Sequence, residues 1–542
     1  MNHYTKFVNQ NIHYIIFFIF FLFIINIYDD FGFPNDEEIS RNNGLIAYNY
    51  ILDIFNINFL EKYPNLVDFN NYYDKDYGVI FELFLVLVEK ALSIEDTKSI
   101  YNSRHLFVSI FFFISCIYFY LTLRLFFSKK ISLIGVLIFI LHPRILSQSF
   151  YNSKDIIFLV FFCISNFYFI YFFHKKNFKN ILLLSIFASL TIATRPMGLI
   201  IPILFIFFFI MVNININKLN HKVLLFSFCL LSLVFTYIFW PYLWENPLNI
   251  FYSLKTMSKF RWLGEVFFNG EYYIAKYMPW YYIPYTILIT TPLIIIFTFL
   301  IGLYLSIKNL FLGLINLKDG NENIWKNNLE LYLFYSLLVI FLTIFFIIEL
   351  KATVYTGWRQ VYFIYPSIVF ISVYCIDFIY KKINQVRFID VVLYFLIILN
   401  ILWIFNNHPY QYNFYNLIIS KKNIKNFELD YYGISNLEIL NKIIKLSKKE
   451  IIRVYVFSVN PYHLSKNMMN EVDKKRIQFT EEINEADYIV SNHYYQKYYY
   501  KNKNYFEKVH PLEVEKYLLE NFQLIYEIRT SNININSIYK KK

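Results

Sequence analysis

The stretch NIHYIIFFIFFLFIINIY (residues 11–28) contains no Asp, Glu, Lys or Arg. It is followed directly by DDFGFPNDEEISRNNG (residues 29–44), which places five carboxylates ahead of Arg41. Because roughly 20 apolar residues span a bilayer as a helix, the first stretch predicts a membrane-spanning helix. The acids that follow either solvate the start of a loop or supply a reactive group, and the residues alone leave both readings open.

Composition predicts that the first stretch is one span of many. Hydrophobic residues make up 57% of the chain and charged residues 17%, whereas soluble domains average about a quarter charged. The fold class expected is therefore mostly α, a polytopic membrane bundle of about eleven transmembrane helices. The apolar stretches are 12–28, 105–127, 131–146, 156–173, 180–194, 197–212, 222–243, 285–306, 331–350, 360–380 and 388–405.

The distribution of basic residues predicts the orientation. The net charge of +12 does not indicate a nucleic-acid partner, because Lys and Arg fall in short clusters between apolar stretches. Lys6 and the clusters at 128–130, 174–180, 217–222, 308–326 and 381–387 all alternate onto one side. The positive-inside rule makes that side cytoplasmic. We therefore expect a cytoplasmic N-terminus and a retained first helix, since no small-residue cleavage site follows it.

The outer side would then carry two long loops, 29–104 and the aromatic-rich 244–284, together with everything after the last span. We expect residues 1–405 to form the membrane domain and residues 406–542 a small extracytoplasmic α/β domain. Within it, 427–448 has the periodicity of an amphipathic helix, and 451–459, 486–495 and 522–531 read as strands. The four cysteines lie in apolar stretches without CxxC spacing and predict neither a disulfide nor a metal site.

Asp36 and Glu37 are the first candidates for chemistry. A carboxylate beside a lipid surface is partly desolvated, which raises its pKa and suits it to act as a general base. Asp155, at the start of a predicted span, is a further acid that either caps its helix or faces the same cavity. The alternative for all three is a structural role.

Basic residues on the predicted outer side are the second group. A cation at the end of a membrane helix is costly unless it is paired, and guanidinium groups bind phosphate well. Snorkelling to ordinary lipid headgroups or pairing with loop acids is the alternative. The residues concerned are Arg104, Arg144, Lys154, Arg195 and Arg359.

The loop 244–284 has the Trp and Tyr density of an interfacial aromatic belt. The sharper reading is a lid over a sugar-sized cavity, with Tyr272, Tyr273 and Trp280 against the substrate and Glu265 or Glu271 as acceptor contacts. Asp74-Lys75-Asp76 matches the DxD pattern that holds a metal and a nucleotide sugar in other transferases. It lies on the predicted outer side, where nucleotide sugars are not available, so we do not assign it that role. No Gly-rich phosphate loop or HExxH motif is present, and no cofactor or metal is expected.

An ordered series of motifs resembles the family 39 membrane glycosyltransferases of the GT-C fold, which include protein O-mannosyltransferases and aminoarabinose transferases. The series begins with Asp36-Glu37 and Arg41, continues with Arg104-His105, and covers the membrane part of the chain. Its other members are HPRILSQSFYNSKD (142–155), TRPMG (194–198), the segment 270–292, GWRQVYFIYP (357–366), HPYQYNFYN (408–416) and FELDYYG (427–433).

The resemblance implies an inverting glycosyltransferase in the inner membrane of a bacterium. Its donor would be a polyprenyl-phosphate sugar, and its acceptor a glycan, lipid or protein. Asp36 would be the catalytic carboxylate, supported by Glu37 and Asp155. The donor phosphate would be bound by Arg41, Arg104, Arg144, Lys154 and Arg359. The rival reading is a lipid-linked glycan flippase without transferase activity, which would need polar groups deep within several spans.

Overall fold

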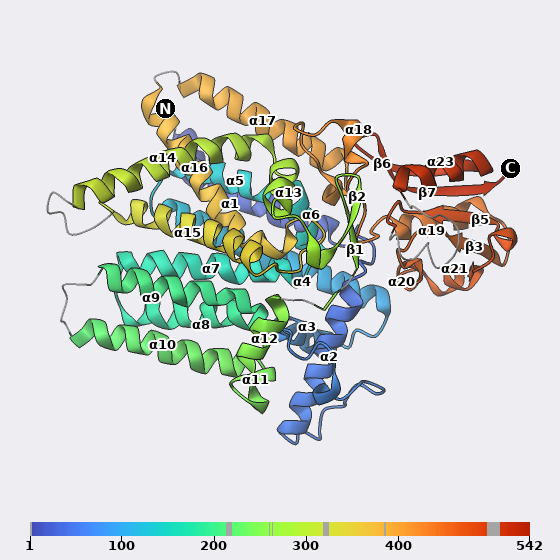
Figure 1. Cartoon of the computed structure of the whole chain (residues 1–542), viewed down its shortest axis with the longest axis horizontal. Coiled ribbons are helices and arrows are strands. Elements are labelled where there is room, and N and C mark those ends of the chain that lie inside the picture. The colour runs from blue at the N-terminus through green and yellow to red at the C-terminus, as the bar shows by residue number, and fades with distance from the viewer. Residues whose placement is uncertain are drawn as a thin grey trace.

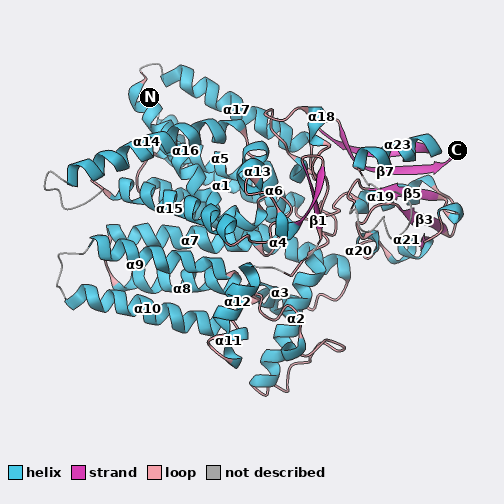
Figure 2. Ribbon diagram, viewed as in Figure 1, coloured by secondary structure: helices cyan, strands magenta, loops and turns pink. Residues whose placement is uncertain are grey.

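The structure, a computed structural model, describes residues 3–212, 219–258, 261–262, 264–317, 325–383, 386–495 and 510–542. Most helices run side by side along the long axis of the molecule, and a small sheet lies beyond one end of them (Figures 1 and 2). The basic segments at 217–222, 308–326 and 381–387 fall partly outside the described residues.

Seven helices in the described residues are long and apolar enough to cross a membrane, which supports an integral membrane protein. They are α4 (Thr97–Arg124), α7 (Asp155–His174), α10 (Leu219–Phe239), α14 (Leu293–Leu317), α15 (Asn328–Glu349), α16 (Tyr365–Lys382) with the preceding η4 (Arg359–Ile364), and α17 (Val386–Asn406). The most apolar window of α7 is 83% buried, because this helix packs between α4 and α8 (Phe178–Thr194). A central helix fixes the position of whatever its first residue carries.

The remaining predicted crossings are helical but shorter or broken. α1 (His3–Ile27), α8 and α9 (Ile200–Val212, after η2 at Pro196–Leu199) are also apolar helices. Their apolar segments, Asn11–Ile27, Phe178–Thr194 and Pro196–Val212, are shorter than the seven spans above. The predicted span 131–146 is a pair, α5 (Lys129–Ile140) and α6 (Pro143–Tyr151), bent by 66°. By length and apolarity the described chain thus has seven spans, or eight with this bent pair, where about eleven were expected.

Proline explains why two of the predicted spans, 131–146 and 285–306, are each broken into two helices. At the bend, Pro143 occupies the first turn of α6, and the His142 side chain caps it by accepting a hydrogen bond from the backbone N–H of Ile145. A helix restarts readily at such a position but does not continue through it. The predicted span 285–306 is likewise two helices, α13 (Tyr282–Thr290) and α14, because Pro292 forces Thr291 into an extended conformation.

The two long loops fold at the end of the bundle nearest the sheet (Figure 1). Residues 29–104 form α2 (Glu37–Ile54), η1 (Phe69–Asn71), α3 (Ile80–Ala91) and the start of α4, with α2 and α3 packed on each other. Residues 244–284 form the end of α11 (Tyr242–Glu245), α12 (Asn249–Ser258), an antiparallel hairpin of β1 (Glu265–Phe268) and β2 (Glu271–Ile274), η3 (Ala275–Tyr277) and the start of α13.

The C-terminal residues form a five-stranded sheet of order β4-β3-β5-β7-β6. Its strands are β3 (Ile452–Val456), β4 (Ile477–Thr480), β5 (Tyr488–Ser491), β6 (Phe522–Thr530) and β7 (Ile533–Lys541). β3 pairs in parallel with β4 and β5, whereas β7 is antiparallel to β5 and β6. The other elements after α17 are η5 (Gln411–Asn413), which packs on α6, and α18 (Lys421–Ile424), α19 (Asn436–Leu446), α20 (Tyr462–Lys466), α21 (Glu471–Arg476), η6 (Ile483–Glu485) and α23 (Pro511–Asn521).

The predicted elements of this region are confirmed in kind and corrected in extent. The three predicted strands correspond to β3, β5 and β6. The amphipathic helix begins at Asn436 and not at Phe427, because Asp430 and Gly433 both adopt positive φ and form a turn ahead of it. The small α/β region expected at the C-terminus is therefore present.

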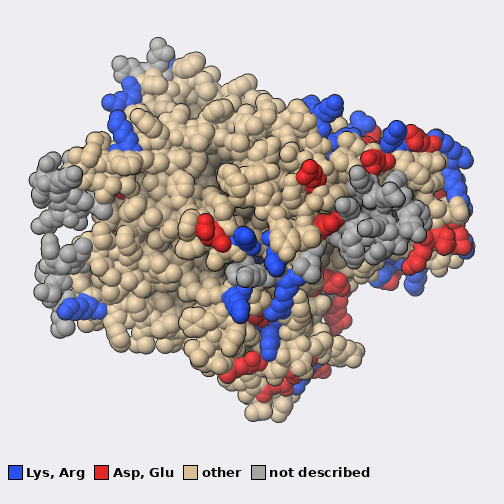
Figure 3. Space-filling view, viewed as in Figure 1, with Lys and Arg blue, Asp and Glu red and all other residues tan. Residues whose placement is uncertain are grey.

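Charge is segregated along the molecule. On the face shown in Figure 3, the middle of the helix bundle is almost free of Lys, Arg, Asp and Glu, while charged residues gather at its two ends. An uncharged band between charged ends is the surface expected of a bundle that spans a bilayer.

Candidate functional site

A cavity of about 400 Å³ lies where the ends of the helices meet the folded loops. Its walls come from five separate parts of the chain: the start of α2, the turn before α3, the α6–α7 connection, the segment 355–359, and Tyr431 and Tyr432 ahead of α19. Arg195, before η2, and Arg261 also line it. Four of the predicted catalytic or donor-binding residues meet here: the acids Asp36 and Asp155 and the cations Lys154 and Arg359.

Asp36 immediately precedes α2 and has one carboxylate oxygen engaged. Its side chain makes no cap hydrogen bond to α2; instead Oδ2 accepts a hydrogen bond of 2.6 Å from Nη1 of Arg359. The Asp36 side chain is 36% exposed, against 6% for Arg359. In the described structure Oδ1 of Asp36 has no recorded partner, which leaves it able to accept a proton from a group entering the cavity.

Arg359 is held from several directions. The same Nη1 donates to the hydroxyl of Tyr432 at 3.0 Å, and the guanidinium lies 4.7 Å from the ring centre of Tyr355. Nη1 is also 3.9 Å from Oδ2 of Asp155. A buried guanidinium with this many partners is fixed in place, so it orients Asp36 as well as neutralising it.

Asp155 is the first residue of the central helix α7 and is fully paired. Oδ1 forms an ion pair with Arg195, and Oδ2 accepts a hydrogen bond of 3.0 Å from the Asn152 amide. The backbone N–H of Asp155 donates in turn to Oδ1 of Asn152 at 2.9 Å. Because both carboxylate oxygens are occupied, Asp155 is suited to holding the cationic groups and less suited to taking up a proton.

Lys154 is the cation of this cavity without a carboxylate partner. Among the described residues no Asp or Glu lies within 4 Å of its ammonium, which sits 4.5 Å above the ring centre of Tyr77. Burial lowers the pKa of Lys154, while the charges of Asp36, Glu82 and Asp74 act in the opposite direction. An ammonium in this state has capacity for an anionic ligand.

Glu37 points away from this cavity. It is buried, and its Oε2 lies 3.0 Å from Nε2 of His105. Nδ1 of His105 faces the carbonyl oxygen of Tyr28 at 3.3 Å and must donate to it, so Nε2 and Glu37 share one proton between them. Burial raises the pKa of Glu37, and His105 counteracts this. The pair ties α2 to α4 and α1.

Arg41 and Arg104 are also outside the cavity. Buried Arg104 contacts Glu82 and, at 2.7 Å, Glu89, and Arg41 binds the other oxygen of Glu89 at 2.9 Å. Glu82 accepts a further hydrogen bond from Ser153. These contacts join α2, α3 and α4 into one unit and leave little capacity for a phosphate.

Arg144 lies behind the cavity, in α6. Its Nε donates to the carbonyl oxygen of Phe414 at 3.0 Å, and its guanidinium is 4.5 Å from the ring centre of Tyr415 and 5.0 Å from that of Tyr412. Among the described residues Nη2 of Arg144 has no partner. Arg144 thus packs the C-terminal region against the helices.

The aromatic loop contributes different residues from those predicted. Arg261 and Trp262 line the cavity, and the Trp262 ring packs on Tyr355 with centroids 4.3 Å apart. Neither Tyr273 nor Trp280 lines this cavity. The hydroxyl of Tyr273 donates a hydrogen bond to Glu271, and Trp280 is 69% exposed beside a separate pocket. Glu265 and Tyr272 lie in the β1–β2 hairpin, each with a buried oxygen that has no partner in the described residues.

Sequence reasoning missed several residues of the cavity. Arg195 was noted as a cation at a helix end but was not assigned to the site. Asp74 was noted only as part of a metal-binding pattern. Tyr355 and Tyr432 carried no signal, since the chain contains 50 tyrosines. Among the described residues no group of three or more His, Cys, Asp or Glu side chains is placed to hold a metal ion.

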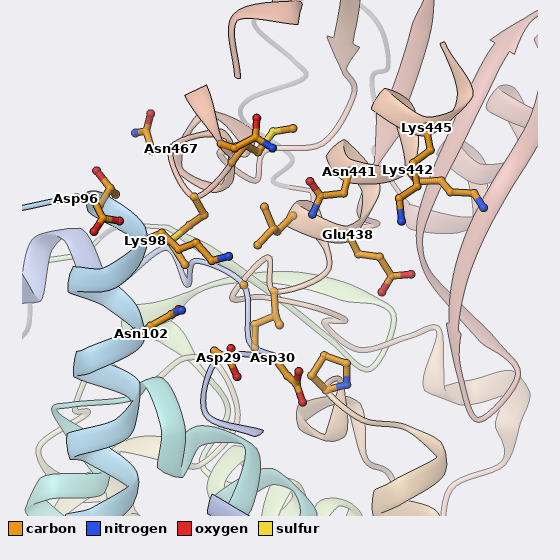
Figure 4. Close-up of a pocket in the computed structure, with 18 of the residues that line it drawn as sticks. Asp29, Asp30, Asp96, Lys98, Asn102, Glu438, Asn441, Lys442, Lys445 and Asn467 are labelled. Carbon is orange, nitrogen blue, oxygen red and sulfur yellow. The ribbon is translucent and has the colours of Figure 1, made fainter. Parts of the chain in front are cut away.

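A second, larger cavity of about 1060 Å³ opens between the bundle and the C-terminal sheet. Figure 4 shows Asp29, Asp30, Asp96 and Lys98 on one wall and Asn441, Lys442 and Lys445 of α19 on the other. A wall formed by residues 32–35 and 431–434 separates the two cavities, with the N–H of Asn35 bonded to the carbonyl of Tyr432 at 3.2 Å. Within this wall Gly32 is so close to Ile434 that a Cβ would lie 2.4 Å from its carbonyl oxygen.

A protein-family model matches part of the helical region. The family model described as dolichyl-phosphate-mannose-protein mannosyltransferase matches residues 99–240. The match supports a glycosyltransferase of the family 39 type. It contains the α6–α7 connection, with Lys154 and Asp155, and Arg195, all of which line the cavity.

Solved structures are similar at a lower level. The Archaeoglobus fulgidus oligosaccharyltransferase AglB, in complex with an inhibitory peptide and a dolichol-phosphate, aligns with 99% of this chain and 75% of its own at 11% identity and a TM-score of 0.47. ArnT from Cupriavidus metallidurans in the apo state aligns with 99% of this chain and 98% of its own at 9% identity and 0.46. At these identities and TM-scores we infer nothing about substrate or activity from the two structures. No curated protein sequence matches the chain.

Proposed function

We propose that this protein is an inverting glycosyltransferase that moves a sugar from a polyprenyl-phosphate donor to an acceptor glycan, lipid or protein. The observation that carries the proposal is the pairing of Asp36 with Arg359 in a cavity that also holds Asp155, Arg195 and Lys154. The family match over residues 99–240 supports transfer over a flippase without bond-making.

The residues divide the chemistry between them. The acceptor's nucleophile attacks the anomeric carbon, its proton passes to Oδ1 of Asp36, and the C1–O bond to phosphate breaks with its electron pair on the leaving polyprenyl phosphate. Lys154 binds the phosphate and stabilises the charge that develops on it. Arg359 fixes Asp36, and Asp155 holds Arg195 and Arg359 in position. A phosphate leaving group needs no general acid.

The placement of the reaction follows from the charge pattern. We propose that the cavity and the C-terminal α/β domain lie on the outer face of a bacterial inner membrane and that the N-terminus is cytoplasmic, in agreement with the positive-inside rule. We retain the division into residues 1–405 and 406–542, with Tyr431 and Tyr432 of the second region completing one wall of the cavity.

The experiment is a reconstitution. The purified protein in lipid nanodiscs would be given undecaprenyl-phosphate sugars and an envelope extract from a strain that lacks the gene. We expect protein-dependent release of undecaprenyl phosphate together with a glycosylated product that is detected by mass spectrometry. Intact donor after incubation with the full set of sugars and the extract would contradict the proposal.

A further inference from the structure

The charged groups around the cavity are paired with two exceptions. Asp36 is bound to Arg359, Asp155 to Arg195, and Asp76 to Arg261 at 3.2 Å. In the described structure the side chains of Lys154 and Asp74 have neither an ion pair within 4 Å nor a hydrogen bond, although both line the cavity. The cavity therefore presents one uncommitted cation and one uncommitted carboxylate.

Asp74 is placed by a rigid turn. The N–H of Tyr77 donates to the carbonyl of Asp74 at 3.1 Å, and the indole of Trp240 donates to the carbonyl of Tyr77 at 3.2 Å. The turn also packs so tightly on the end of α8 that a Cβ on Gly78 would lie 1.8 Å from the carbonyl oxygen of Ala193. The backbone of Asp74 is therefore fixed at the cavity before a ligand enters, which is a form of preorganisation.

The neighbours of Asp74 decide what it can bind. Burial raises the pKa of Asp74, and the nearby charges of Lys154 and Arg261 act in the opposite direction. The Asp74 carboxylate is therefore close enough to interact electrostatically with Lys154, the cation that we assign to the donor phosphate. A carboxylate repels phosphate and accepts hydrogen bonds from hydroxyl and ammonium groups. The part of the donor that adjoins its phosphate is the sugar ring, which carries such groups.

We propose that Asp74 is a specificity-determining residue that accepts hydrogen bonds from the hydroxyl or amino groups of the donor sugar. The inference rests on the proposed function and assigns Asp74 to recognition of the sugar, distinct from Lys154, which binds the phosphate. It also gives a role to one acid of the Asp74-Lys75-Asp76 pattern without a metal.

The test compares two ligands that differ only in the sugar. Binding of undecaprenyl phosphate and of undecaprenyl-phosphate mannose or aminoarabinose would be measured for the wild type, Asp74→Asn and Asp74→Ala. Because a hydrogen bond to a charged group contributes about 1.5–3 kcal/mol, we expect Asp74→Ala to weaken binding of the sugar-loaded lipid roughly ten- to a hundredfold. Binding of undecaprenyl phosphate should not weaken in either variant.

The matched control is Asp68→Asn, which alters an exposed acid in the same loop outside the cavity. Equal losses for both ligands, or no loss for either, would overturn the inference. A rise in the acceptor KM with unchanged donor binding would also overturn it, since Asp74 would then serve the acceptor. If the wild type binds undecaprenyl phosphate but no sugar-loaded form, the proposed donor is wrong, and the inference falls with it.

Discussion

Nη1 of Arg359 lies 2.6 Å from Oδ2 of Asp36 and 3.9 Å from Oδ2 of Asp155, so one guanidinium links carboxylates from two distant parts of the chain. The two differ in how much of their hydrogen-bonding capacity is used. Asp155 is fully paired and buried, whereas Asp36 keeps one oxygen free and remains partly exposed. Under the proposed function, this asymmetry favours Asp36 for proton transfer and Asp155 for support.

Lys154 should determine affinity for the lipid phosphate. Replacement by Met removes the cation of the cavity that lacks a carboxylate partner among the described residues, and we expect undecaprenyl phosphate to bind about tenfold more weakly, equivalent to about 1.4 kcal/mol. Lys154→Arg should keep most of the affinity. Lys98→Met, an exposed lysine of the other cavity, is the control, and unchanged affinity in Lys154→Met would remove Lys154 from phosphate binding.

Arg104 should act on stability. Its loss leaves Glu82 and Glu89 buried without their main partner, which typically costs about 3–5 kcal/mol. We therefore expect Arg104→Met to lower the melting temperature of the purified protein strongly, while the remaining folded molecules keep their affinity for undecaprenyl phosphate. A variant that melts like the wild type but fails to bind the lipid would reverse this assignment.

Glu428 should make stability depend on pH. Burial raises the pKa of Glu428 to about 8, against smaller opposing effects of the Phe267 backbone N–H and of Arg359 and Arg144. The folded chain thus binds this proton more tightly than the unfolded chain does. Its contribution to stability is complete below the ordinary glutamate pKa of about 4.3 and is lost as the pH rises to about 8.

Glu428→Gln removes this dependence. We expect the variant to melt several degrees higher than the wild type at a pH above 8 and at the same temperature near pH 4, as followed by intrinsic fluorescence. Melting curves whose difference does not change with pH would show that the pKa of Glu428 is the same in the folded and the unfolded chain.

The sequence predicted the site where position along the chain carries the information. Asp36, Lys154, Asp155 and Arg359 each lie at or next to the end of a helix on the same predicted side. Charge at helix ends selected them as candidates, together with Arg104 and Arg144, which lie outside the cavity. The prediction of one span over residues 131–146 considered only the apolar residues. It did not use Pro143, which marks the position where the helix breaks. The three strands β3, β5 and β6 needed only local patterns.

What could not be predicted depends on partners in space. Arg41 and Arg104 looked like phosphate ligands because α3 was not recognised as a helix. Glu82 and Glu89, seven residues apart, lie on one face of it. Glu89 binds both arginines, and Glu82 binds Arg104. The direction in which Glu37 points was equally hidden, since its partner His105 is 68 residues away.

Asp36→Asn tests the central claim most directly. The substitution keeps the shape of the side chain and removes the base, and general-base catalysis contributes about 10²–10⁴-fold. With Asp29→Asn, an exposed acid of the same stretch, as control, transfer from an undecaprenyl-phosphate sugar should fall by that factor while donor binding and membrane insertion stay unchanged. Transfer at the wild-type rate by Asp36→Asn would contradict the account.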